Sequence, residues 1–153
     1  MRVLGLDFGE RRIGLALSDP TGTLARPWRT IERGGADEDP VAQVAEIVRE
    51  LAGDEEGLDA VVIGLPFRLD GTAHAMTDRV RAFAAALGAR LTAPVALQDE
   101  RLSSHEAERR LSLRERDWRK RKRVLDAASA AVMLQDYLDE RAAGRTPAGG
   151  EER

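Results

Sequence analysis

Two apolar segments of this chain each contain one acidic residue, and an acid in such a place constrains the fold. Asp7 lies near the end of a strand-like run from Val3 to Gly9, and Asp126 lies in a helix-like apolar run from Val124 to Leu134. An ionised carboxylate is costly to bury alone, so a carboxylate held against a core usually pairs with a cation or coordinates one. A third acid, Glu100, follows another predicted strand.

The length and composition indicate one cytoplasmic domain. A chain of 153 residues can bury an ordinary core, and we expect a folded domain over residues 1–141 and a disordered tail over residues 142–153. The absence of cysteine excludes disulfides, thiolate zinc sites and thiol nucleophiles. No signal-peptide pattern opens the chain, and no apolar run is long enough to cross a bilayer.

The first third of the chain predicts an antiparallel meander. Residues 2–8 and 13–18 are strand-like and are joined by turn residues 9–12. Turn residues 19–22 lead to a third extended segment that ends near residues 30–31.

The remaining residues alternate between helix and strand patterns. The expected elements are a helix over residues 41–51, a strand over 59–65, a helix capped by Thr72 and ending near Leu87, a strand over 95–97, and a final helix that follows the charged segment 114–123 and ends near Arg141. This order predicts an α/β fold with one mixed sheet of about five strands and helices on both faces. Such sheets place their sites at strand ends.

Two of the acids fall at predicted strand ends. Asp7 precedes a glycine that would let a ligand approach the backbone, although an isolated Asp-x-Gly more commonly only starts a turn. Strand alternation puts Asp99 and Glu100 on opposite faces, so only one of them can point toward Asp7. We favour Glu100; the simpler interpretation is an acid that stabilises the N-terminus of the next helix.

Asp126 is expected to face the core. It shares a helical face with Ala130, Met133 and Tyr137, and no clear chain break before it supports the alternative of a helix N-cap. Three converging carboxylates without a His or Cys cluster would form an all-oxygen site suited to Mg²⁺ or Mn²⁺. Two such ions can activate water and stabilise the leaving oxygen of a phosphodiester, so the predicted chemistry is phosphodiester hydrolysis.

Several ordered blocks of the chain resemble the bacterial YqgF/RuvX family. These blocks are Leu4–Gly9, Val62–Pro66 with Asp70–Thr72, Asp99–Ser103, Lys120–Asp126 and Met133–Asp139. The resemblance implies a ribonuclease H-like fold related to the RuvC resolvases and a metal-dependent nuclease site formed by Asp7, Glu100 and Asp126. It also implies maturation of the 5′ end of 16S rRNA, or, as an alternative, resolution of Holliday junctions.

Basic charge is concentrated before the last helix. Residues 101–123 contain ten Lys or Arg and four Asp or Glu, a local net charge of +6 in a chain whose net charge is −3. Such a cluster fits phosphate neutralisation and base stacking, although a solvated basic face is the usual alternative. The expected nucleic-acid contacts are Arg68, Arg101, Arg116, Trp118, Arg119, Lys120, Arg121, Lys122 and Arg123.

Other functional classes remain open at this point. Actin-like ATPases and sugar kinases also carry Asp-x-Gly after an N-terminal strand, but they close a nucleotide between two domains and this chain supplies one. A non-catalytic nucleic-acid-binding module would use the acids only to organise the fold. The partner is expected to be precursor rRNA or branched DNA and not a membrane. Paired cuts in a two-fold junction favour a homodimer, whereas RNA trimming is compatible with a monomer.

Overall fold

In the part of the chain that the structure describes, five strands form one mixed sheet. They are β1 (Val3–Phe8), β2 (Arg12–Ser18), β3 (Ala25–Glu32), β4 (Ala60–Leu65) and β5 (Val95–Asp99), in the spatial order β3-β2-β1-β4-β5. The first three strands pair antiparallel, whereas β4 pairs parallel with both β1 and β5. The predicted meander and mixed sheet are therefore confirmed.

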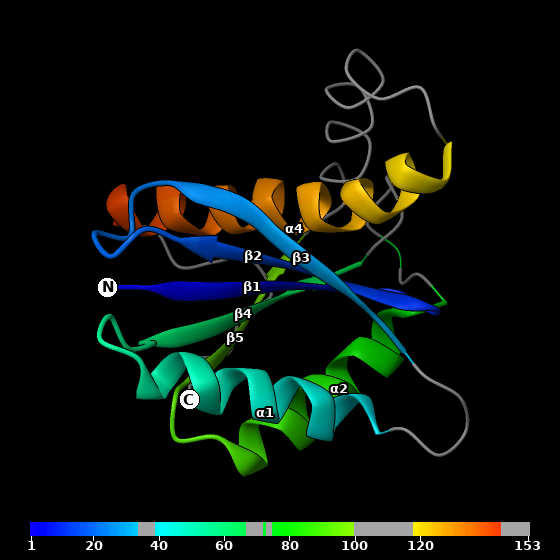
Figure 1. The fold of residues 1–153 in the computed structure, drawn as a ribbon, viewed down its shortest axis with the longest axis horizontal. Helices are drawn as coiled ribbons and strands as arrows, with labels where there is room; N and C mark the ends of the chain where they lie inside the picture. Colours follow the sequence, from blue (N-terminus) through cyan, green and yellow to red (C-terminus); the bar gives the residue numbers. More distant parts are fainter. Residues whose placement is uncertain (34–38, 67–71, 73–74, 100–117, 145–153) are drawn as a thin grey trace.

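Among the described residues, the helices cover both faces of the sheet (Figure 1). In this computed structural model, α1 (Pro40–Gly53) and α2 (Thr77–Arg90) lie on one face, and α4 (Trp118–Ala142) lies on the other. The structure describes residues 1–33, 39–66, 72, 75–99 and 118–144, with side chains in the last range described from Leu125 onward. The predicted disordered tail falls almost wholly outside these ranges. No helix in the described ranges is long and apolar enough to cross a bilayer.

Strand alternation divides the core between the two layers. Along β1, Leu4, Leu6 and Phe8 pack with the buried side chains of α1 and α2, whereas Val3 packs with those of α4. The ring of Phe8 lies 4.4 Å from that of Phe83 on α2. Odd-numbered positions of β1 therefore face α4.

The start of α1 follows its sequence signals. The Asp39 side chain accepts a hydrogen bond from the Val41 N–H at 2.9 Å, and Pro40 occupies the first helical position, where its missing N–H costs nothing. The predicted helix over residues 41–51 is confirmed, and its buried residues include Val44 and Leu51.

The predicted start of α2 is wrong. Thr72 lies outside the helix, which begins at Thr77 and ends at Arg90 instead of near Leu87. The Thr77 hydroxyl donates to the Pro66 carbonyl oxygen at 2.5 Å and so ties the start of α2 to the residue that follows β4. The start of α2 is therefore set by the contact between Thr77 and Pro66 and by the buried residues of the helix, which begin at Thr77.

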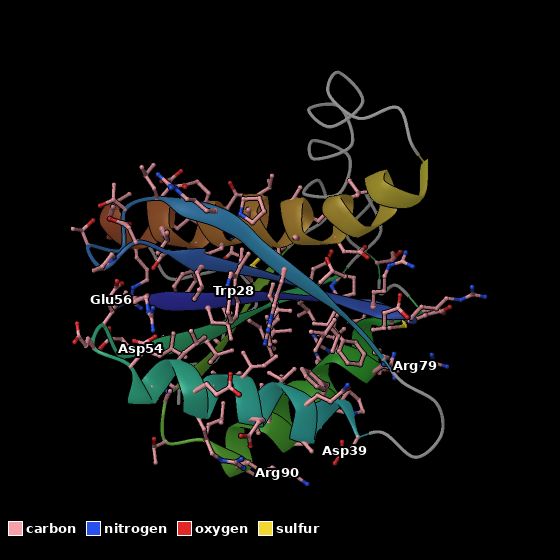
Figure 2. The ribbon with its side chains drawn as sticks, viewed as in Figure 1. Trp28, Asp39, Asp54, Glu56, Arg79 and Arg90 are labelled. Carbon is pink, nitrogen blue, oxygen red and sulfur yellow. The ribbon has the colours of Figure 1, made fainter. Side chains whose placement is uncertain are left out.

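Arg2 anchors the start of β1 to the segment after α1. Its side chain is buried, and its guanidinium donates to the carbonyl oxygens of Leu51 and Gly57 and to the carboxylate of Asp54. Figure 2 shows Asp54 and Glu56 at the end of the sheet where β1 begins. The hydrogen bond from Arg2 lowers the pKa of Asp54. This ion pair therefore stabilises the end of the sheet opposite the carboxyl end of β1.

Replacing Arg2 with Met should lower the free energy of unfolding by about 2 kcal/mol, because two carbonyl oxygens lose a buried charged donor. The folded pKa of Asp54 is depressed, so its stabilisation is present above the unfolded pKa of about 3.9 and is lost as the pH falls through the folded pKa. Arg2→Met should therefore lose less stability than the wild type on acidification. Urea denaturation across this pH range measures both effects, and equal acid sensitivity would contradict the assignment.

Candidate active site

Three parallel strands end at one edge of the sheet. Leu6 on β1 lies beside Ile63 on β4, and Leu65 on β4 lies beside Asp99 on β5. Asp7 follows Leu6 directly, so it lies at the carboxyl end of β1. Open α/β sheets form their ligand sites outside the carboxyl ends of such strands. This edge is therefore the candidate site.

Asp7 lies on the face of the sheet that α4 covers. It alternates with Leu6 and Phe8, which face α1 and α2, and it shares the orientation of Val3. Its Cα partner on β2 is Gly14, and its side chain is partly buried. The Asp7 carboxylate therefore enters the layer between the sheet and α4.

The backbone of α4 lies directly on Gly14. A Cβ added at Gly14 would lie 2.0 Å from the carbonyl oxygen of Asp126 and 2.8 Å from the backbone nitrogen of Ala127. No side chain fits in that space, so the glycine permits the close approach of helix and strand. Because Gly14 is the cross-strand partner of Asp7, Asp126 lies over the strand position next to Asp7, on the same face of the sheet.

Asp126 lies within α4 and does not cap it. The helix begins at Trp118, and the residues that share the face of Asp126, namely Ala130, Met133 and Tyr137, are all buried. The predicted inward orientation is confirmed. Its side chain remains 27% exposed, so the carboxylate lies at the border of the core.

The Asp126 carboxylate is paired with Arg12. The Arg12 Nε donates to Oδ2 of Asp126 at 2.6 Å, and the Arg12 side chain is 25% exposed. Arg12 begins β2 and alternates in phase with Gly14, which places it on the face covered by α4. This arginine supplies the cation that an acid within an apolar helix requires.

The sequence pattern did not single out Arg12 as a site residue. A usable signal was present, because Arg12 lies two and four residues before Gly14 and Ala16, and small residues at alternate positions mark a strand face that a helix can approach closely. A long basic side chain at the open end of that face can reach an acid on the helix.

The turn between β1 and β2 is held rigidly beside this pair. The Gly9 N–H donates to the Arg12 carbonyl oxygen at 2.9 Å, and a Cβ at Gly9 would lie 2.8 Å from that oxygen. The Arg33 guanidinium donates to the carbonyl oxygens of Gly9 and Glu10 and lies 4.4 Å from the centre of the Phe8 ring. The turn itself therefore requires the glycine of Asp-x-Gly.

Several predicted site residues fall outside the described ranges: Arg68, Glu100, Arg101 and Arg116. Asp99 is described, and its alternation with Val95 and Leu97 places it toward α1 and α2, away from Asp7. Glu100 thus stays the predicted third ligand.

Residues 118–123 belong to α4 itself. The sequence placed this basic stretch before the final helix, and that boundary is wrong, because α4 begins at Trp118. Lys and Arg are good helix formers, so a charged extension of an apolar helix costs little. Its side chains are not among those described.

The described acids match the donor preference of a hard cation. Asp7 and Asp126 offer carboxylate oxygens, which Mg²⁺ and Mn²⁺ prefer. Within the described ranges, no group of three or more His, Cys, Asp or Glu residues could hold a metal ion, and the third predicted ligand, Glu100, lies outside them. Asp7 and Asp126 suit such an ion provided that the ion pair between Arg12 and Asp126 is broken.

Comparison with known proteins identifies the family. A family model described as "RuvX: Holliday junction resolvase" matches residues 1–140. The chain belongs to the RuvX family. A protein of Pelotomaculum thermopropionicum is 38% identical over 151 residues, which cover 99% of this chain and 95% of the relative. A protein of Anaeromyxobacter dehalogenans is 44% identical over 142 residues, which cover 93% and 99%. Both relatives are named "Putative pre-16S rRNA nuclease".

Solved structures support the same fold. The chain is similar to Thermus thermophilus RuvC, with a TM-score of 0.54 at 18% identity and coverage of 96% of this chain and 99% of that one. It is also similar to T. thermophilus RuvC in complex with a Holliday junction substrate, with a TM-score of 0.53 at 16% identity and coverage of 100% and 99%. These similarities confirm the RuvC-like ribonuclease H fold of this RuvX family member.

Proposed function

We propose that this chain is a divalent-metal-dependent nuclease that hydrolyses phosphodiester bonds in the 5′-end maturation of precursor 16S rRNA. The observation that carries the proposal is that Gly14, the cross-strand partner of Asp7 near the carboxyl end of β1, lies directly beneath the backbone of Asp126. The names of relatives that match nearly the full chain support the substrate. Asp7, Glu100 and Asp126 are the proposed metal ligands.

The proposed chemistry divides between the ions and the chain. Bound Mg²⁺ or Mn²⁺, ideally as a pair, would activate the attacking water and stabilise the leaving oxygen. Asp7 and Asp126 contribute the negative charge that makes such binding favourable, and the rigid turn at Gly9 fixes the end of β1 that carries Asp7. Arg12, on the same face, can neutralise a phosphate oxygen once it is released from Asp126.

The start of α4 is the proposed nucleic-acid contact. Arg119, Lys120, Arg121, Lys122 and Arg123 follow Trp118 without interruption at the N-terminal end of a helix whose later residues include Asp126. Helix N-termini and clustered basic residues both favour phosphate, and an indole can stack on an unpaired base. Arg68, Arg101 and Arg116 are proposed to extend this contact.

A four-way DNA junction is the second candidate substrate. The description of the matching family model names Holliday junction resolvase, and the fold is that of RuvC. Resolution requires paired cuts in a two-fold substrate, so this alternative predicts a dimer, whereas trimming of rRNA does not require one.

Cleavage of three substrates in parallel tests these proposals. We expect the purified protein to cleave a precursor 16S rRNA fragment in Mg²⁺ or Mn²⁺, to lose that activity in EDTA, and to regain it when the ion is restored. An unrelated single-stranded RNA and an immobile four-way DNA junction serve as comparison substrates. Undiminished cleavage in EDTA would refute the metal-dependent mechanism, and preferential symmetrical cutting of the junction would favour the resolvase.

A further inference from the structure

The proposed metal ligand Asp126 is already ion-paired with a basic side chain of the protein, Arg12. The Arg12 Nε lies 2.6 Å from the Asp126 carboxylate, and each side chain is about three-quarters buried, at 25% and 27% exposure. An ion pair at that depth is shielded from solvent more than a surface pair and interacts more strongly. Any divalent ion that is coordinated by the Asp126 carboxylate must compete with Arg12 for it.

Both partners are attached to backbone that is held in place. The backbone of Arg12 accepts the hydrogen bond that closes the β1–β2 turn, and Arg33 fixes the same turn from the end of β3. The backbone of Asp126 is pressed against Gly14. The pair can therefore break by rotation of the Arg12 side chain, without displacement of α4.

The position of Arg12 also places it next to Asp7. Asp7 is the Cα partner of Gly14, and Arg12 lies two residues before Gly14 on the same face. Arg12 and Asp7 are thus diagonal cross-strand neighbours, a separation that a long side chain can span. An ion shared by Asp7 and Asp126 would lie in the region that the guanidinium now occupies, and two cations there would repel each other.

We propose that Arg12 is a built-in competitor of the divalent ion: it neutralises Asp126 while the site holds no metal, and it must be released before the ion binds. This inference rests on the proposed function, because it takes Asp126 to be a metal ligand. Arg12 is a positioning residue that sets metal affinity. Its release leaves a guanidinium beside the site, where a phosphate of the substrate can accept its hydrogen bonds.

Mn²⁺ binding without nucleic acid tests the competition. Isothermal titration calorimetry should show about tenfold tighter Mn²⁺ binding by Arg12→Gln than by the wild type, because the competing charge is gone. Arg12→Lys retains the charge and should remain close to the wild type. Arg11→Gln removes one charge from an exposed neighbour in the same turn and is the matched control, with unchanged affinity expected.

Thermal unfolding separates competition from a purely structural ion pair. Saturating Mn²⁺ should raise the melting temperature of Arg12→Gln more than that of the wild type at the same concentration. A structural pair would instead give a lower melting temperature with the same Mn²⁺-induced increase, and that result would overturn the inference. If Arg12→Gln does not fold, Arg12→Met retains the apolar stem and carries the same test.

Asp126→Asn distinguishes failure of the inference from failure of the proposed function. If this variant binds Mn²⁺ as tightly as the wild type, then Asp126 is not a ligand and both the competition and the proposed metal site are wrong. If it loses Mn²⁺ binding while Arg12→Gln shows unchanged affinity, the competition alone is refuted and the proposed nuclease site stands.

Discussion

Asp7→Asn should slow phosphodiester cleavage by about a thousandfold or more while the protein remains folded. Asparagine preserves the size of the side chain and removes the charge that would hold a divalent ion. Asp7 lies at the end of β1, partly buried beneath α4, so the isosteric change should leave the packing of the strand undisturbed. Initial rates on the precursor rRNA fragment in Mg²⁺ and in Mn²⁺ measure the loss.

Asp99→Asn is the matched control for this prediction. Asp99 ends the neighbouring parallel strand β5, but its alternation with Leu97 directs it to the opposite face of the sheet. We expect cleavage within a few-fold of the wild-type rate, and circular dichroism should show equal folding of both variants. If the Asp7→Asn protein were fully active, Asp7 would not be a catalytic residue.

Gly14→Ala should lower the free energy of unfolding by about 3 kcal/mol, near the upper end of the usual cost of overpacking. The added methyl group would lie 2.0 Å from the Asp126 carbonyl oxygen, and neither the strand nor the helix backbone can yield without moving a whole element. Displacement of α4 would also move Asp126 away from Asp7, so cleavage should fall with stability. Urea denaturation followed by circular dichroism measures the first effect.

Gly53→Ala provides the comparison for the glycine substitution. Gly53 ends α1, and a Cβ added there would meet no atom within 4 Å. Alanine at a helical position restricts the unfolded chain, so stability should stay equal or rise by up to about 1 kcal/mol. If Gly14→Ala proved as stable as Gly53→Ala, the close approach of α4 to β2 would not be a requirement of the fold.

The order of strands and helices could be predicted from the sequence because each element carries a strong local pattern. Alternating apolar residues define β1 and β2, and the face shared by Asp126, Ala130, Met133 and Tyr137 is buried as expected. To predict that Asp7 lies at a strand end, it was enough to locate the end of β1 in the sequence. These features depend on periodicity, which a single sequence displays directly.

Features that depend on tertiary contacts could not be predicted in this way. The start of α2 is tied by Thr77 to Pro66 on the segment after β4, and no local cap marks it, because Met76 makes no side-chain capping bond. The Arg12–Asp126 pair joins residues 114 positions apart. Such a contact depends on how closely α4 approaches β2; small residues at alternate positions of β2 indicate that a helix can come close, but the distance itself is evident only in the structure, where Gly14 permits it.

The glycines beneath α4 limit how this protein can be engineered for heat resistance. At Gly5 an added Cβ would lie 2.9 Å from the Cβ of Leu134, so this second contact between sheet and helix is also filled. Replacing glycine with alanine is a common stabilising change elsewhere, but at Gly5 and Gly14 the added methyl group would push α4 away from the sheet. Designers should direct substitutions to the α1–α2 layer, where Gly53 and other exposed positions can change without altering the spacing between the two acids.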